Sequence, residues 1–169
     1  MGLNNTEMKQ RDFQEKKAWA DKFLPEIESI IRKVAGKIIS IREATEEEDT
    51  KQSTDYVIEI SSGRIGCRVR DYKYVSFNDV TIRAWLSSGV RTEIDKLREG
   101  LLQWYLYMWI SDERMKWVFW NVDKALQAGL FNGSDIIKNK DMMTGFVSIP
   151  ISTLSEKECV VDIYDGVRT

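Results

Sequence analysis

The sequence predicts an α/β protein of the α+β type, in which helices flank a mixed β-sheet. Short β-branched runs alternate with amphipathic helical segments, an alternation typical of layered architectures. The 169 residues are 43% hydrophobic, which is enough for one domain with a sizeable core. No linker, repeat or low-complexity tract divides the chain, so we expect a single domain over 1–169. Within it we expect an N-terminal helical segment at 6–24, a core at 25–122 and C-terminal elements at 123–164.

The first elements are two helices and a strand. Residues 6–24 carry apolar side chains at helical spacing among charges, which indicates an amphipathic helix. Pro25 interrupts it and favours the first turn of a second helix over 25–35, which Gly36 ends. The β-branched run 37–42 then predicts a strand.

A β-hairpin over residues 54–73 is the centre of the predicted site. Ser62 and Gly63 form the expected turn, because glycine tolerates the positive φ that primed turns require. Pairing outward from this turn sets Asp55 opposite Arg70 and gives the hairpin an apolar face and a charged face. The apolar face holds Tyr56, Ile58, Ile60, Ile65, Cys67 and Val69, and the other face holds Asp55, Val57, Glu59, Arg68 and Arg70.

The second half of the chain is expected to contain the longest helix and three more strands. Extended chain over 74–85 leads to a helix over 92–110, with Thr92 as its N-cap. A short helix begins at Asp123. The further strands are expected at 116–122, 144–151 and 158–164.

Composition and charge narrow the classes of function. The chain has no histidine, which excludes histidine-based catalysis and histidine metal ligation. A metal site would have to be built from carboxylates and would favour Mg²⁺, Mn²⁺ or Ca²⁺. The net charge of -2 gives no global attraction to nucleic acid, so binding would need a local basic patch. Cys67 and Cys159 lie far apart in sequence and indicate free thiols.

Nothing in the sequence indicates a membrane protein. No apolar run approaches the length needed to span a bilayer, and residues 1–13 lack an apolar signal core. We therefore expect a cytoplasmic protein that does not bind membranes.

The order of elements resembles the αβββαβ core of the PD-(D/E)XK superfamily, the restriction endonuclease-like nucleases that include Holliday junction resolvases. The resemblance covers residues 25–122 and rests on element order and on a hairpin that Asp55 opens. It implies a nuclease that depends on Mg²⁺ or Mn²⁺, in which carboxylates hold the metal and a lysine positions water. Small size and acidity also fit a protein of phage or mobile-element origin, and a homodimer is compatible with either.

Site residues follow from the resemblance by position. Asp55 matches the acid that opens the second core strand, and Glu28 or Glu26 matches the helix acid. Asp71 and Lys73 form a literal D-X-K sequence, so the implied catalytic residues are Asp55, Asp71, Lys73 and Glu28. The implied metal ligands are Asp55, Asp71 and, from the acidic run 46–49, Asp49.

The third strand departs from the family pattern. Arg68 and Arg70 stand where the family has an acid and a lysine, which removes a metal ligand and adds two cations. Asp71 belongs to the opposite side-chain parity and would reach Asp55 only through a β-bulge.

Three interpretations therefore remain for the charged face. The first is a metal-dependent endonuclease, and the second is a catalytically inactive nuclease-fold module that binds nucleic acid or a protein partner. In the third, Asp55 and the arginines form cross-strand ion pairs that stabilise the sheet by ~0.2–1 kcal/mol each. The candidate nucleic-acid-binding residues are Arg64, Arg68, Arg70 and Arg83, with Lys73 beside them.

Overall fold

The computed structural model describes residues 14–15, 18–36, 38–43, 56–60, 63–132, 135–140 and 142–168. The chain forms two units, Met1–Gly36 and Lys37–Thr169. Within the described ranges, no helix combines the length and the apolar character needed to cross a bilayer.

The first unit contains the predicted helix as α2, Leu24–Ala35. A proline in its first turn and a glycine with φ 79 after its last turn mark its ends, as predicted. Its buried residues Ile27, Ile30 and Ile31 recur at helical spacing and form one apolar stripe. The described residues 14–15 and 18–21 of the expected N-terminal helix are also helical.

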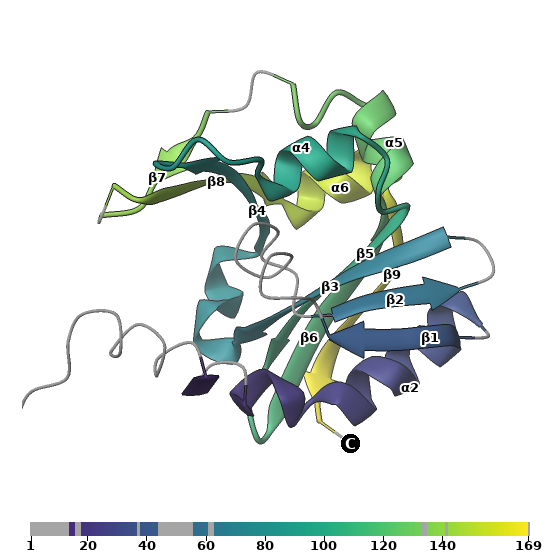
Figure 1. Ribbon diagram of the computed structural model, residues 1–169. Helices are drawn as coiled ribbons and strands as arrows, with labels where there is room; N and C mark the ends of the chain where they lie inside the picture. The colour runs from purple at the N-terminus through teal and green to yellow at the C-terminus, as the bar shows by residue number, and fades with distance from the viewer. Residues whose placement is uncertain are drawn as a thin grey trace, which may run out of the picture. The chain divides into compact units, whose positions relative to one another are not determined.

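The second unit is built on a six-stranded mixed sheet (Figure 1). Its strands, in spatial order, are β1 Ile38–Glu43, β2 Tyr56–Ile60, β3 Gly63–Asp71, β5 Trp104–Ile110, β6 Arg114–Asn121 and β9 Val160–Val167. All neighbours are antiparallel except β3 and β5, which are parallel. Parallel neighbours need a crossover connection, and here the crossover carries β4 and α4, which contribute to the candidate site.

A second layer lies on one side of this sheet (Figure 1). It consists of a three-stranded sheet in the order β4-β8-β7 together with short helices. Its members are β4 Asp79–Leu86, β8 Thr144–Pro150, β7 Ile137–Lys138, α4 Glu93–Arg98, α5 Val122–Gln127 and α6 Ile151–Glu156. One hydrophobic core joins the layers, and it includes Ile82, Leu97, Tyr105, Tyr107, Trp109, Val118, Trp120, Ile149 and Leu154. The protein is therefore α+β, with a mixed sheet flanked by helices.

The hairpin of β2 and β3 has a different register from the predicted one. Ile60 pairs with Gly63 and Tyr56 with Cys67, so the predicted pairing was wrong by two residues. Gly63 opens β3 instead of forming the turn. Because the shift is even, every side chain keeps its predicted face. Asp55 lies outside the described residues, and its pairing with Arg70 stays untested.

The predicted helix over 92–110 was wrong beyond its first turns. Helix α4 ends at Arg98, Gly100 adopts φ 72, and Trp104–Ile110 form strand β5. This strand lies between β3 and β6 and is buried on both faces, so its apolar residues are continuous and do not alternate. A short apolar run of this kind does not distinguish a buried strand from a buried helix.

Most of the other predicted elements are confirmed. The runs 37–42, 65–70, 116–122, 144–151 and 158–164 appear as β1, β3, β6, β8 and β9 with ends shifted by a few residues. The helix predicted at Asp123 is α5. The segment 74–85 was expected to be extended throughout, but it begins within a 3-10 helix, η1 Tyr72–Phe77, before β4. Neither β7 nor α6 was expected.

Candidate anion-binding site

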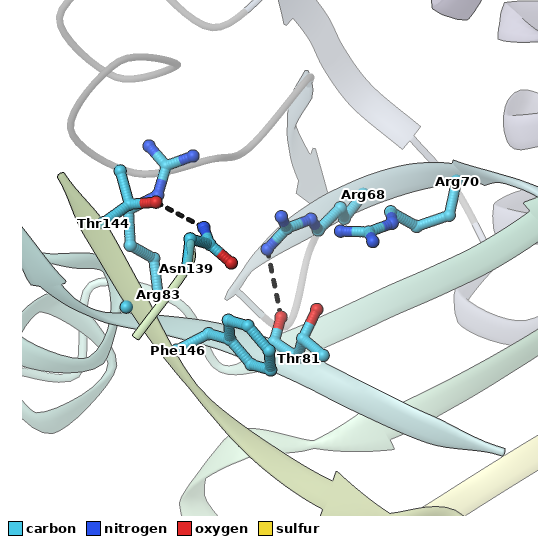
Figure 2. Close-up of a pocket in the computed structure, with 8 residues that line it drawn as sticks. Arg68, Arg70, Thr81, Arg83, Asn139, Thr144 and Phe146 are labelled. Atoms are coloured by element: carbon cyan, nitrogen blue, oxygen red, sulfur yellow. Dashed lines mark hydrogen bonds between the residues drawn. The ribbon is translucent and has the colours of Figure 1, made fainter. Parts of the chain in front are cut away.

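A pocket of about 150 Å³ lies between β3 and the β4-β8-β7 sheet (Figure 2). Its lining residues are Arg68, Arg70, Thr81, Arg83, Asn139, Thr144, Gly145 and Phe146. Among these described residues three are arginines and none carries a carboxylate. The protein as a whole is slightly acidic, so this pocket is a local concentration of positive charge.

Arg68 is held in a defined orientation at the base of the pocket. Its Nη1 atom donates to the carbonyl oxygen of Thr81 at 3.0 Å and lies 3.5 Å from Oε2 of Glu93. The guanidinium carbon is 6.0 Å from the centre of the Tyr107 ring. Only 15% of the Arg68 side chain is exposed. Contacts from β4, α4 and β5 therefore fix a cation that β3 supplies.

Glu93 is the buried anion behind Arg68. It begins α4 and is 1% exposed. Oε2 accepts a hydrogen bond from the backbone N–H of Arg83 at 2.9 Å, and Oε1 accepts one from the hydroxyl of Tyr105. Burial raises the pKa of Glu93, against the opposing effects of Arg68, Tyr105 and Arg83. Burial and the neighbouring Glu93 also raise the pKa of Tyr105, so its hydroxyl stays a proton donor.

Arg70 and Arg83 bring two more cations to the same pocket. Arg70 lies two residues after Arg68 on β3 and therefore points to the same face. Arg83 comes from β4, where it pairs with Phe146 of β8. In Figure 2 the guanidinium groups of Arg68 and Arg70 lie beside each other and face Asn139. Strands of both sheets thus supply the positive charge.

Opposite Arg68 and Arg70 lie the polar residues Asn139 and Thr144, with the Arg83 side chain beside Thr144 (Figure 2). Asn139 Nδ2 donates to Thr144 Oγ1, and the Asn139 backbone N–H donates to the Thr144 carbonyl at 2.9 Å.

The guanidinium fork of arginine matches the oxygens of carboxylate and phosphate groups. The pocket is smaller than the ~300–1,000 Å³ typical of small-molecule sites. Its size and charge suit one small oxyanion group.

Asp71 and Lys73 do not line this pocket. Strand β3 pairs with β5 in continuous register through Asp71, so no bulge brings Asp71 to the face of Arg70. Asp71 instead caps η1, where Oδ1 accepts from the Lys73 backbone N–H and Oδ2 lies 2.9 Å from Lys73 Nζ. The backbone hydrogen bond from Lys73, followed by its side chain, lowers the pKa of Asp71. Asp71 in turn raises the pKa of Lys73.

Glu28 and Arg64, two further predicted site residues that the structure describes, do not line the pocket. Glu28 is in α2 of the first unit and pairs with Arg32 at 3.9 Å. Arg64 pairs with Glu59 at 3.1 Å and does not line the pocket. Asp49 lies, like Asp55, outside the described residues.

The described residues do not assemble the metal site that the resemblance implies. In the part of the chain that the structure describes, no three Asp, Glu or Cys residues come together as a metal-ion site. Asp71 is engaged by Lys73 in an N-cap. Of the implied metal ligands only Asp71 belongs to the described residues, and a single carboxylate does not supply the several oxygen ligands that Mg²⁺ or Mn²⁺ takes.

Sequence reasoning missed several residues of the pocket. Thr92 is the N-cap that the sequence predicts, and its N–H donates to Asp95 Oδ2 at 2.8 Å, but the sequence does not indicate that Glu93 is buried. Its burial follows from β5 being a strand, because Tyr105 then points at α4. Asn139 and Thr144 carry no sequence signal for this position.

The chain matches no protein-family model, no curated protein and no solved structure. Its function is therefore inferred from the pocket itself.

Proposed function

We propose that the protein is a non-catalytic module of nuclease-like fold that binds the phosphate backbone of nucleic acid. Arg68, Arg70 and Arg83 are the proposed phosphate-binding residues. The observation that carries the proposal is that Arg68 and Arg70 lie side by side in one small pocket, which Arg83 of the second sheet also lines (Figure 2).

Preorganisation supports a binding role for this cluster. Arg68 is already oriented by Thr81 and Glu93, so a ligand would not have to order that side chain. Arg70 lies against the Tyr74 ring at 4.9 Å, which restricts its side chain too. A phosphate entering the pocket would meet two guanidinium forks whose positions are set by the fold.

The order of elements supports the nuclease-like fold. Helix α2, strands β1, β2 and β3, helix α4 and strand β5 follow the αβββαβ order, with η1 and β4 inserted before α4. Arg68 and Arg70 occupy the third-strand positions at which the family has an acid and a lysine. With arginines in place of the metal-binding acid and the lysine, a fold of this order would bind phosphate groups without hydrolysing them.

Binding to labelled DNA and RNA oligonucleotides tests the proposal. The affinity of the wild type should fall by about tenfold between about 50 and 200 mM salt, because a few phosphate contacts displace counterions. Arg70→Ala should weaken binding, and Arg70→Lys should restore it only in part, because lysine keeps the charge but not the fork. Arg114→Ala is the matched control, since Arg114 pairs with Asp165 and does not line the pocket.

The absence of any oligonucleotide binding would overturn the proposal and leave a protein partner with an acidic surface as the ligand. Equal binding by wild type and Arg70→Ala would also contradict it.

A metal-dependent nuclease is the second candidate, favoured by the same order of elements. Incubation with plasmid, single-stranded and branched DNA in Mg²⁺ or Mn²⁺ tests it. Nicking that Asp55→Ala abolishes would support this candidate and contradict the non-catalytic proposal.

A further inference from the structure

The 3-10 helix η1 presents two exposed aromatic side chains on one side. Tyr74 and Phe77 are three residues apart, and side chains at this spacing eclipse each other in a 3-10 helix. Tyr74 is 38% exposed and Phe77 is 71% exposed. The Phe77 ring is the more open of the two, because the Arg70 guanidinium carbon and Lys73 Nζ lie 4.9 Å and 5.1 Å from the centre of the Tyr74 ring.

Both ends of η1 are fixed by hydrogen bonds, which hold the backbone that carries the two rings. Asp71 caps the start. At the end, Asn78 adopts φ 50 and donates its N–H to the carbonyl of Val75 at 3.0 Å. The Asn78 side chain also accepts a hydrogen bond from Lys116 Nζ at 2.8 Å.

The aromatic platform borders the arginine pocket through Arg70. The Arg70 guanidinium carbon is 4.9 Å from the Tyr74 ring centre, and Arg70 also lines the pocket. A ligand that places one phosphate against Arg70 would therefore have its neighbouring group next to η1. Lys73 adds little net charge here, because Asp71 pairs with it.

A second pair of cation and aromatic ring borders the pocket at Gly145. Gly145 lies between Trp85 of β4 and Lys138 of β7 in the small sheet. Without a side chain at Gly145, Lys138 Nζ reaches to 4.4 Å from the Trp85 ring centre. One pair of cation and aromatic ring, Arg70 with Tyr74 and Lys138 with Trp85, thus borders the pocket at each of these two positions.

Resting on the proposed phosphate binding, we infer that the ligand is a single-stranded nucleic acid whose bases stack on Tyr74 and Phe77. Single-strand-binding surfaces combine cations that follow the backbone with aromatic rings that stack on successive bases. In a duplex the bases are paired and stacked inside the helix and cannot reach η1. The pocket holds a phosphate, and the rings of η1 hold the adjoining bases.

Four probes distinguish this inference from general anion binding. They are an oligothymidylate, an oligouridylate, a DNA duplex of equal length and inorganic polyphosphate, which carries the charge without bases. We expect the wild type to bind at least one single strand more tightly than the duplex. The tighter of the two single strands then identifies DNA or RNA as the ligand.

Phe77→Ala is the decisive variant because Phe77 is too exposed to contribute much to folding. It should weaken single-strand binding by ~5-fold or more, the effect of losing one stacked base, and leave polyphosphate binding unchanged. Phe77→Tyr, which keeps the ring, should retain the wild-type affinity. Arg70→Ala should weaken binding of all four probes.

The outcomes distinguish a failure of the proposed phosphate binding from a failure of the single-strand inference. No binding of any probe overturns the proposed function itself. Binding of polyphosphate and duplex as tightly as single strands overturns only the single-strand inference, as does unchanged single-strand binding by Phe77→Ala.

Discussion

Arg68 has both a proposed binding role and a structural role. It faces the pocket, and it is the cation paired with the buried Glu93. Replacing Arg68 would therefore disturb folding as well as ligand binding, because a buried carboxylate would lose its partner. Among the described contacts, the Arg70 guanidinium packs only against the Tyr74 ring. Arg70 is therefore the better position for binding experiments.

Glu93→Ala should destabilise the protein. The change removes the buried carboxylate that lies 3.5 Å from Arg68 Nη1 and leaves the Tyr105 hydroxyl without this acceptor. We expect a loss of ~2–4 kcal/mol in the free energy of unfolding, measured by chemical denaturation. Glu99→Ala, at the exposed end of the same helix, should change it by less than ~1 kcal/mol. A similar small effect for Glu93→Ala would show that the buried contact contributes nothing.

The raised pKa of Glu93 predicts a direction for the pH dependence of stability. Between the ordinary glutamate pKa and the higher folded value, the folded state holds a proton that the unfolded chain has released. The contribution of Glu93 to stability is therefore fully present below the unfolded pKa of about 4.3 and declines as pH rises above it.

Glu93→Gln isolates this effect because glutamine does not titrate. The free energy of unfolding of the wild type minus that of Glu93→Gln should fall as pH rises from about 4 to about 8. The lowered pKa of Asp71 affects both proteins equally and cancels. A difference that rises with pH would mean that Arg68 holds the Glu93 pKa below its ordinary value.

Among the elements, β3 and β5 depend on a close approach at Gly66. A Cβ atom there would lie 2.6 Å from Leu102 Cδ1 and 3.0 Å from Tyr105 Cε2. These are core atoms, and Tyr105 is also the donor to Glu93. Only glycine lets the two strands pack at this distance.

Gly66→Ala should therefore destabilise the fold through overpacking, by ~1–3 kcal/mol. Thermal or chemical unfolding measures this change. Arg64→Ala, at an exposed position of the same strand, is the control and should stay within ~0.5 kcal/mol of the wild type. Tolerance of alanine at Gly66 would mean that Leu102 moves aside freely.

The sequence predicts elements well where one face is polar and poorly where both faces are buried. In β2 and β3 alternation placed Arg68 and Arg70 on one face correctly, even though the register was wrong by two residues. In β5 the run from Trp104 to Ile110 has no polar face, so a strand and a helix gave the same pattern.

The candidate site was predictable only in part for the same reason. Arg68, Arg70 and Arg83 were identified from the charged face and from alternation in the segment that became β4. Their meeting in one pocket depends on the β4-β8-β7 sheet, and no pattern along the chain encodes its position. The D-X-K sequence at Asp71 does not by itself distinguish a catalytic motif from a helix cap, because the capping interaction seen here uses the same residue types.

At the scale of the whole molecule, the proposed binding would depend on a local positive charge in a protein whose net charge is negative. The net charge is -2, so attraction at a distance would be weak and the arginines of the pocket would supply the main electrostatic contact. The salt dependence of the affinity should therefore reflect only the phosphate contacts made in the pocket.

A plot of log affinity against log salt concentration should have a slope of about -2 for a single strand that contacts about three phosphates. Arg70→Ala should make the slope shallower by ~0.7, the contribution of one phosphate contact. Fluorescence anisotropy titrations at several salt concentrations measure both slopes. A much steeper slope for the wild type would place additional contacts outside the pocket.

The parallel pairing of β3 with β5 also orders the events of folding. The β5-β6 hairpin closes locally, with Ser111 N–H bonded to the Arg114 carbonyl, as does the β2-β3 pair. Strands β3 and β5 can pair only after the intervening chain, from Tyr72 to Gln103, has closed a long loop, which is slow. Arg68 and Thr81 belong to segments that this closure brings together, so the pocket assembles late. Recovery of anion binding during refolding should lag behind the formation of the hairpins.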